Sequence, residues 1–90
     1  MTVYIDKPRW AFGRMVVARM VADTPEELQT MAEEVGMHPR QHRGLLTSGE
    51  HFELWKGDRA RVMRRGAVQV TRDEVDAMLA KRKESGTWAP

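Results

Sequence analysis

The sequence predicts a small α/β fold, in which three helices cover a three- to four-stranded sheet in the order β-β-α-β-α-β-α. Short apolar runs with strand character alternate with segments of helical periodicity, a pattern typical of α/β proteins. The chain has 90 residues, 41% of them hydrophobic, and no cysteine. We therefore expect one domain over residues 1–84 and a flexible tail over 85–90, without disulfides or cysteine-based metal and redox chemistry.

Two strands are expected before the first helix. Residues 3–6 (VYID) alternate apolar and polar side chains, the pattern of a half-buried strand. Residues 7–13 contain proline and glycine and are expected to form a loop. Residues 15–22 form an apolar run interrupted only by Arg19, which predicts a buried strand.

The first helix has clear start and stop signals. Thr24 is expected at the N-cap, Pro25 at the first helical position, and Glu27 completes a capping box. Apolar side chains recur at helical spacing through Val35, and Gly36 is a typical residue after a helix C-terminus.

The second half of the chain contains shorter elements. We expect a loop over 37–50, a weak strand over 51–55 and a second helix over 58–65. A strand over 67–70 follows. A second capping box over 71–74 starts the third helix, whose last turn is expected at 81–83.

The charge is concentrated in the middle of the chain. The net charge of +2 is the sum of −2 over residues 1–36, +5 over 37–72 and −1 over 73–90. A basic segment favours an anionic partner, although a solvated helix face has the same composition. The N-terminus lacks the pattern of a signal peptide, and no apolar run is long enough to span a bilayer. We expect a cytoplasmic protein, a monomer or small homo-oligomer, with no membrane partner.

The second predicted helix separates its arginines into two groups. At 100° per residue, Arg61, Arg64 and Arg65 lie together on the face opposite the apolar one. Arg59 lies on the apolar face and needs a partner, because an unpaired buried charge costs several kcal/mol, about 3–5.

Arg19 raises the same question within a strand. A charged residue in an apolar strand either lies at a sheet edge, which we favour, or meets an acid. Arg19 and Arg59 side by side would form an anion-binding pocket. Near acids, with Asp6, Asp23 and Glu53 as candidates, they would form a structural network.

Histidines and acids offer a weaker catalytic hypothesis. In an extended segment His51 and Glu53 lie on the same side, and with Asp6 they are candidates for general acid–base chemistry. His38 and His42 have the i, i+4 spacing of helical metal ligands, but Pro39 disfavours a helix there. We expect no metal and no cofactor, because phosphate-binding, nucleophile and metalloprotease motifs are absent from the sequence.

The tryptophans have two interpretations. Trp10 and Trp55 flank basic residues, as side chains that stack on nucleic-acid bases do. Large aromatic residues also cover small cores, and we favour this reading. Trp88 belongs to the tail and is expected to be exposed or packed on a partner.

Several residues resemble those of one small family. They are Tyr4-Ile5-Asp6, Trp10, Gly13-Arg14, Val21-Ala22-Asp23, Glu27-Leu28, His51-Phe52-Glu53-Leu54, Arg59-Ala60-Arg61 and Gly66-Ala67-Val68. Over residues 2–72 the chain resembles the domain of unknown function 4031, found in bacteria and their phages. The resemblance implies a compact α/β domain and no particular activity.

The chain departs from that family at three places. Arg19 stands where the family usually has histidine, and Glu53 where it usually has aspartate. Residues 41–43 (QHR) replace an aromatic run. These departures indicate a divergent member without the family's His and Asp pair.

Three functions follow as hypotheses. We favour a binding module for an anionic partner such as a nucleic acid, with candidate residues Arg19, Arg40, Arg43, Lys56, Arg59, Arg61, Arg64 and Arg65. The first alternative is a protein-interaction factor, for instance a phage product that acts on a host protein through its acidic first helix or the Trp88 tail. The second is a small hydrolase or nuclease that uses His51, Glu53 and Asp6, so an enzyme is the less expected outcome.

Overall fold

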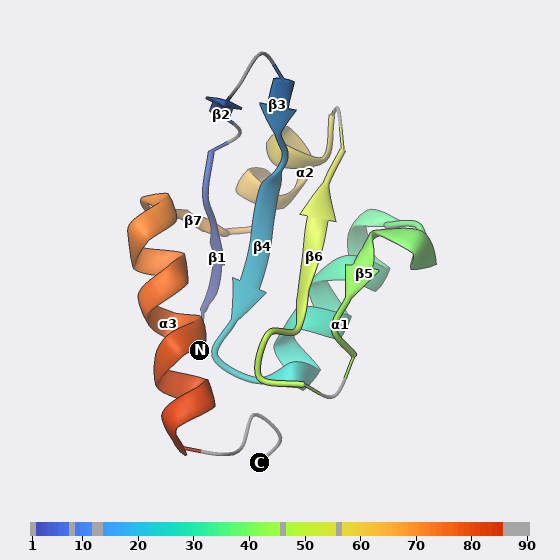
Figure 1. Ribbon diagram of the computed structural model, residues 1–90. Helices are drawn as coiled ribbons and strands as arrows, with labels where there is room; N and C mark the ends of the chain where they lie inside the picture. The colour runs from blue at the N-terminus through green and yellow to red at the C-terminus, as the bar shows by residue number, and fades with distance from the viewer. Residues whose placement is uncertain (1, 8, 12–13, 46, 56, 86–90) are drawn as a thin grey trace.

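The computed structural model (Figure 1) describes residues 2–7, 9–11, 14–45, 47–55 and 57–85, with the backbone alone for 9–11, 14–16 and 85. Helices and strands follow one another along the chain as β1 (Val3–Ile5), β2 (Arg9–Ala11), β3 (Arg14–Val16), β4 (Ala18–Ala22), α1 (Pro25–Val35), the 3-10 turn η1 (Pro39–Gln41), β5 (His42–Arg43), β6 (His51–Leu54), α2 (Asp58–Arg64), β7 (Val68–Gln69) and α3 (Arg72–Ser85).

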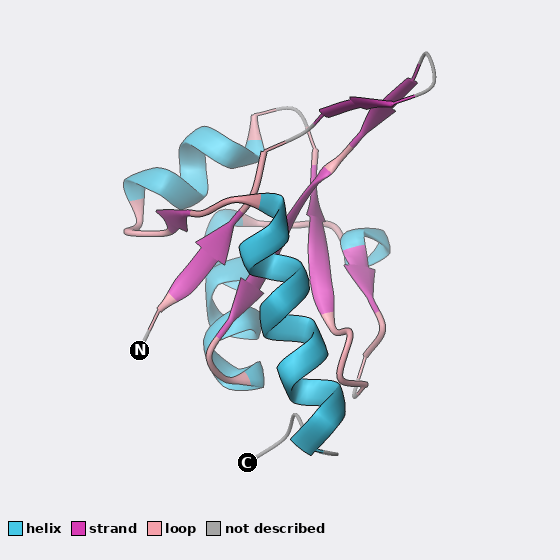
Figure 2. Ribbon diagram, turned by 60° about the vertical axis from the view of Figure 1, so that its left-hand side comes forward, coloured by secondary structure: helices cyan, strands magenta, loops and turns pink. Residues whose placement is uncertain are grey.

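The main sheet has five strands in the order β5-β6-β4-β1-β7. Its strands run antiparallel except for β7, which pairs parallel to β1. In the centre of the sheet Met20 of β4 lies opposite Ile5 on one side and Phe52 on the other. Strands β2 and β3 form a separate two-stranded ribbon that projects from one end of the sheet (Figure 2).

Helices cover both faces of this sheet (Figures 1 and 2). Helices α1 and α2 lie on one face, and α3 crosses the other. Strand alternation places Ile5, Met20 and Phe52 toward α1 and α2, where they pack with Leu28 and Val62 in one hydrophobic cluster. The α/β class and the three covering helices are therefore confirmed.

The helix caps form where the sequence places them. Thr24 Oγ1 accepts a hydrogen bond from the Glu27 amide at 3.2 Å and donates one to the Glu27 carboxylate at 2.9 Å. Gly36 ends α1 with φ of 71°, a conformation that glycine adopts without strain. Thr71 caps α3 by accepting from the Glu74 amide at 3.1 Å. Helix α1 buries Leu28, Met31, Ala32 and Val35.

The predicted strand number and order are wrong in three respects. The expected loop 7–13 contains β2, and the expected strand 15–22 is divided into β3 and β4 with a break at Val17. The expected loop 37–50 contains η1 and β5. Each missed element has only two or three residues, too few for side-chain periodicity to reveal.

The C-terminal half of α3 is fastened to the sheet by Arg82. Its guanidinium donates to the carbonyl at the end of β4. Burial lowers the pKa of Arg82, while the nearby carboxylates of Asp23 and Glu50 act in the opposite direction. Within the described part of the chain, no helix has the length and apolar character to cross a bilayer.

Candidate anion-binding site

Helix α2 presents its arginines to solvent from a fixed position. Val62 is fully buried and anchors the helix to the core. Arg61, Arg64 and Arg65 are exposed, as the helical angles predict. The helix follows Gly57, whose φ of 89° lets the chain turn sharply after β6.

These three arginines line a groove between α2 and the end of α1. The groove has a volume of about 460 Å³, and Glu34 and Val35 complete its lining. Arg65 forms an ion pair with Glu34 at 3.3 Å, with both side chains about half exposed. The charged lining side chains, three arginines and one glutamate, sum to a charge of +2.

Arg64 is the arginine of this groove with the least neutralised charge. Its Nε donates to the carbonyl of Ala60 at 3.3 Å, a bond within the same helix. Among the described residues it forms no salt bridge, whereas Arg61 and Arg65 each pair with an acid. An anion that enters the groove therefore meets a guanidinium that is not paired with any of the described carboxylates.

A buried carboxylate holds the start of α2 in place. Asp58 is almost fully buried, and its Oδ2 accepts from the Trp55 amide at 2.8 Å and from the Gln41 side chain at 2.6 Å. Its Oδ1 accepts from Arg61. Gln41 also donates to the carbonyl of Glu53 at 2.8 Å. This carboxylate joins η1, β6 and α2, a role that was not predicted from the sequence. The three-residue spacing to Arg61 is the local signal that could have indicated it.

Arg19 lies in the centre of the sheet, so the expected edge position is wrong. Strand β4 has β1 and β6 as neighbours. Arg19 meets the fully buried Asp6 instead: its Nε is 2.9 Å from Asp6 Oδ2, and its amide donates to Asp6 Oδ1 at 2.6 Å. Asp76 of α3 accepts from Arg19 at 2.9 Å, and Arg72 lies 3.6 Å from Asp6.

Arg59 is half-buried and also reaches Asp6. Its Nη1 donates to the Asp6 carbonyl at 2.6 Å, and its Nη2 donates to the side chain of Gln69. Arg19 and Arg59 are thus both placed around Asp6, one on its carboxylate and the other on its backbone. Both guanidiniums donate hydrogen bonds to groups of the same chain, as expected for a structural network.

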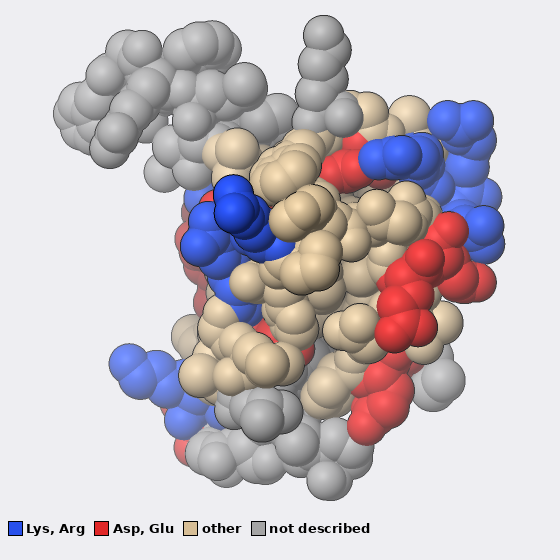
Figure 3. Space-filling model, turned by 90° about the vertical axis from the view of Figure 1, so that its right-hand side faces the viewer, with Lys and Arg blue, Asp and Glu red and all other residues tan. Residues whose placement is uncertain are grey.

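The other basic candidates are spread over the surface. Arg40 is exposed on η1, while Arg43 on β5 pairs with Glu53 at 3.2 Å. Lys56 lies outside the described residues. In Figure 3 the lysine and arginine side chains of one face form separate groups, with acidic side chains beside the group at the upper right. On this face the basic side chains therefore form local groups and not one continuous stripe.

Two of the catalytic candidates, His51 and Glu53, lie on β6, whereas Asp6 follows β1. Glu53 is opposite Arg19 on β4, and Arg19 is bonded on its other side to Asp6, so β4 separates the two acids. His51 Nδ1 donates to the carbonyl of Gly49 at 2.8 Å, while Glu53 pairs with Arg43. Strand β4 therefore lies between Asp6 and the strand that carries His51 and Glu53.

The histidines have separate partners. His38 Nδ1 accepts from the Arg40 amide at 3.0 Å. His42 Nε2 donates to Glu50 at 2.6 Å, and its ring stacks on Phe52 with centroids 4.3 Å apart. Among the described residues no group of three or more His, Asp or Glu side chains is placed to hold a metal ion.

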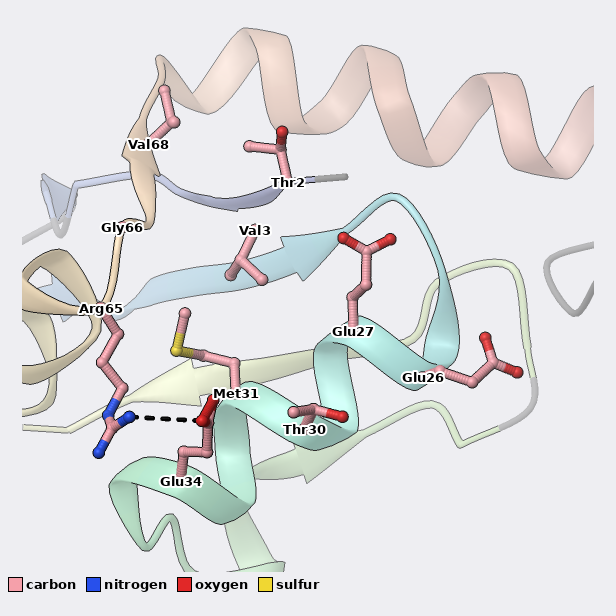
Figure 4. Close-up of a pocket in the computed structure, with 10 residues that line it drawn as sticks. All are labelled: Thr2, Val3, Glu26, Glu27, Thr30, Met31, Glu34, Arg65, Gly66 and Val68. Atoms are coloured by element: carbon pink, nitrogen blue, oxygen red, sulfur yellow. Dashed lines mark hydrogen bonds and ion pairs between the residues drawn. The ribbon is translucent and has the colours of Figure 1, made fainter.

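A second groove adjoins the first and has the opposite charge. It has a volume of about 500 Å³ and lies between α1 and the β1–β7 edge of the sheet (Figure 4). Val3, Met31 and Val68 contribute apolar surface, and three glutamates, Glu26, Glu27 and Glu34, lie along α1. The Glu34–Arg65 ion pair lies between the two grooves, because both residues line each of them.

Tryptophan positions differ in what they offer to a partner. Trp55 is 47% exposed, so nearly half of its surface faces solvent. Its indole stacks on His38 with ring centroids 5.7 Å apart. The side chain of Trp10 and the whole of Trp88 lie outside what the structure describes.

Comparison with known proteins identifies a family. A family model described as "Protein of unknown function (DUF4031)" matches residues 3–82. No curated protein and no solved structure matches the chain. The match confirms the resemblance drawn from the sequence and extends it into α3. It includes every described strand, helices α1 and α2 with the α2 arginines, and α3 as far as residue 82.

Proposed function

The chain belongs to the DUF4031 family of proteins of unknown function, and from its geometry we propose that it is a small binding module for an anionic partner such as a nucleic acid. The contact surface is the groove formed by Arg61, Arg64 and Arg65. No catalytic step is part of this proposal.

The observation that carries the proposal is the concentration of positive charge in a concave site. Three guanidiniums line a groove of about 460 Å³, and Arg64 forms no salt bridge among the described residues. Guanidinium groups bind phosphate and carboxylate oxygens through paired hydrogen bonds, which a lysine cannot reproduce. In a groove, several hydrogen-bond donors can also point toward one anion, whereas on a convex surface they point away from one another.

The ion pairs in this groove do not oppose the proposal. Arg65 and Glu34 are each about half exposed, and such pairs contribute about 0–1 kcal/mol. An anion that replaces Glu34 as the partner of Arg65 therefore gives up little stability. The bond between Arg61 and the buried Asp58 instead holds the Arg61 guanidinium in place.

The proposal is tested with a matched pair of variants. Arg64→Gln/Arg65→Gln removes two charges from the groove, and Lys81→Gln/Lys83→Gln removes two from exposed positions on α3. We expect a labelled single-stranded oligonucleotide of eight nucleotides to bind the wild type, with an affinity that falls steeply with salt. Binding should weaken in the arginine variant and persist in the lysine variant. Equal affinity of all three proteins, or no binding by the wild type at low salt, contradicts the proposal.

One observation favours a second function, a protein-interaction factor. The groove along α1 combines apolar surface from Val3, Met31 and Val68 with three glutamates, which suits a basic segment of another protein (Figure 4). Such a partner would be captured from a host lysate by the wild type. It would be lost when Glu26→Gln/Glu27→Gln removes two charges from the groove. Capture that is unchanged in this variant argues against the groove as the contact.

A further inference from the structure

We propose that the anionic partner is a single-stranded nucleic acid, and that Trp55 stacks on one of its bases. This inference rests on the proposed function and names the partner class. It depends on a second surface feature, an exposed aromatic pair beside the start of α2. The pair consists of Trp55 and His38.

The aromatic pair is built and held by hydrogen bonds. His38 caps η1: its ring Nδ1 accepts from the Arg40 amide at 3.0 Å, and its own amide donates to the Gln41 side chain at 2.7 Å. The Trp55 amide donates to Asp58 at 2.8 Å. Both residues therefore have fixed backbones, and their rings lie at an interplanar angle of 23°.

The pair leaves indole surface open to a ligand. Trp55 is 47% exposed although its ring stacks on that of His38. Exposing this much of a tryptophan to water is unfavourable, at about 25 cal/mol for each Å² of apolar surface. An aromatic ligand that covers it recovers that free energy, and every base presents a flat face that can do so.

The same contacts connect the aromatic pair to the arginines. Asp58 accepts hydrogen bonds from the Trp55 amide and from the Arg61 side chain. Arg61 in turn lines the groove with Arg64. Arg40 lies next to Gln41, which also donates to Asp58. The residue that offers the stacking surface and one of the phosphate donors thus bond to the same carboxylate. Proteins that bind single strands combine these two kinds of group.

The geometry favours a single strand over a duplex. The bases of a duplex are stacked on one another, so their faces are closed to a side chain, whereas those of a single strand are free. Helix α2 has seven residues, a length of about 10 Å, so it offers a short contact. A site of a few nucleotides is the expected size.

The test separates stacking from charge. Two labelled probes are used, an eight-nucleotide single strand and an abasic oligomer of the same length and charge. We expect Trp55→Ala to weaken binding of the single strand about tenfold, the size of one base stack, and to leave binding of the abasic oligomer unchanged. Trp55→Phe should recover most of the affinity. Leu45→Ala, which shortens another exposed apolar side chain, should leave the affinity for both probes unchanged.

Each result decides the matter. If Trp55→Ala binds the single strand as the wild type does, while the arginine variant binds both probes weakly, the stacking inference fails and the proposed function stands. If the wild type binds neither probe, both the stacking inference and the proposed function fail.

The Trp55 hydrogen bond to Asp58 uses the backbone amide, so the alanine variant keeps it. In a Trp10→Phe/Trp88→Phe background, Trp55 is the remaining tryptophan and gives the indole fluorescence. If Trp55 stacks on a base, adding the single strand should quench this fluorescence. Unchanged fluorescence contradicts the stacking inference.

Discussion

Replacing the buried carboxylate at the centre of the arginine network should destabilise the fold severely. In Asp6→Asn the side chain keeps its size but loses its charge. The amide nitrogen of the new side chain cannot accept a hydrogen bond from Arg19 Nε, which lies 2.9 Å from Asp6 Oδ2 in the wild type. Arg72, 3.6 Å from the same oxygen, loses its counter-charge as well.

The size of this effect follows from burial. Asp6 is fully buried and the Arg19 side chain is 13% exposed. Breaking a buried ion pair by removing one partner costs about 3–5 kcal/mol. Arg19 keeps Asp76 at 2.9 Å, which places the expected loss near the lower end, at about 3 kcal/mol. A domain of this size has a total stability of roughly 5–13 kcal/mol, so the loss is a large fraction of it.

The control is the exposed partner of the same arginine. Asp76 is 60% exposed, so Asp76→Asn should cost about 0–1 kcal/mol. Urea unfolding followed by far-UV circular dichroism measures both variants. With a slope of about 1.5 kcal/mol/M, the Asp6 variant should unfold at a urea concentration about 2 M lower than the wild type. Equal midpoints for the Asp6 and Asp76 variants would refute the conclusion that Arg19 is held by a buried structural pair.

Two further predictions concern the elements that support the site. Thr24→Ala removes the cap of α1 and should lower the free energy of unfolding by about 1 kcal/mol. In a thermal melt the Tm should fall by about 4–8 °C. An unchanged Tm contradicts the role of the cap. Asp58→Ala leaves the Trp55 amide without its acceptor and the Gln41 side chain without one of its two acceptors, and should cost about 1–3 kcal/mol. Hydrogen exchange at the Trp55 amide should accelerate in this variant, and wild-type protection there would show that the carboxylate is dispensable.

Local signals made part of the fold predictable. The start and end of α1 were predicted correctly because Thr24, Glu27 and Gly36 interact within one helix and its caps. The exposure of Arg61 and Arg64 was also correct, because helical geometry alone fixes their direction. These features depend on residues at most a few positions apart.

Long-range pairing was not predictable in the same way. Arg19 was expected at an edge, yet β4 lies between β1 and β6, and the order of strands depends on contacts between distant segments. The acceptor role of Asp58 was missed because one of its donors, Gln41, lies 17 positions earlier. The candidate site therefore came from the sequence as a set of arginines. The groove that these arginines line, and the exposure of Trp55 beside His38, came from the structure.

The central claim, that the α2 groove binds an anionic partner, is tested most directly by the salt dependence of binding. The slope of log Kobs against log salt changes by about 0.7 for each phosphate contact to a single strand. We predict that Arg64→Gln/Arg65→Gln makes the slope shallower by about 1.4 relative to the wild type, and that Lys81→Gln/Lys83→Gln leaves it unchanged. Identical slopes for the wild type and the arginine variant would contradict the assignment of the site to α2.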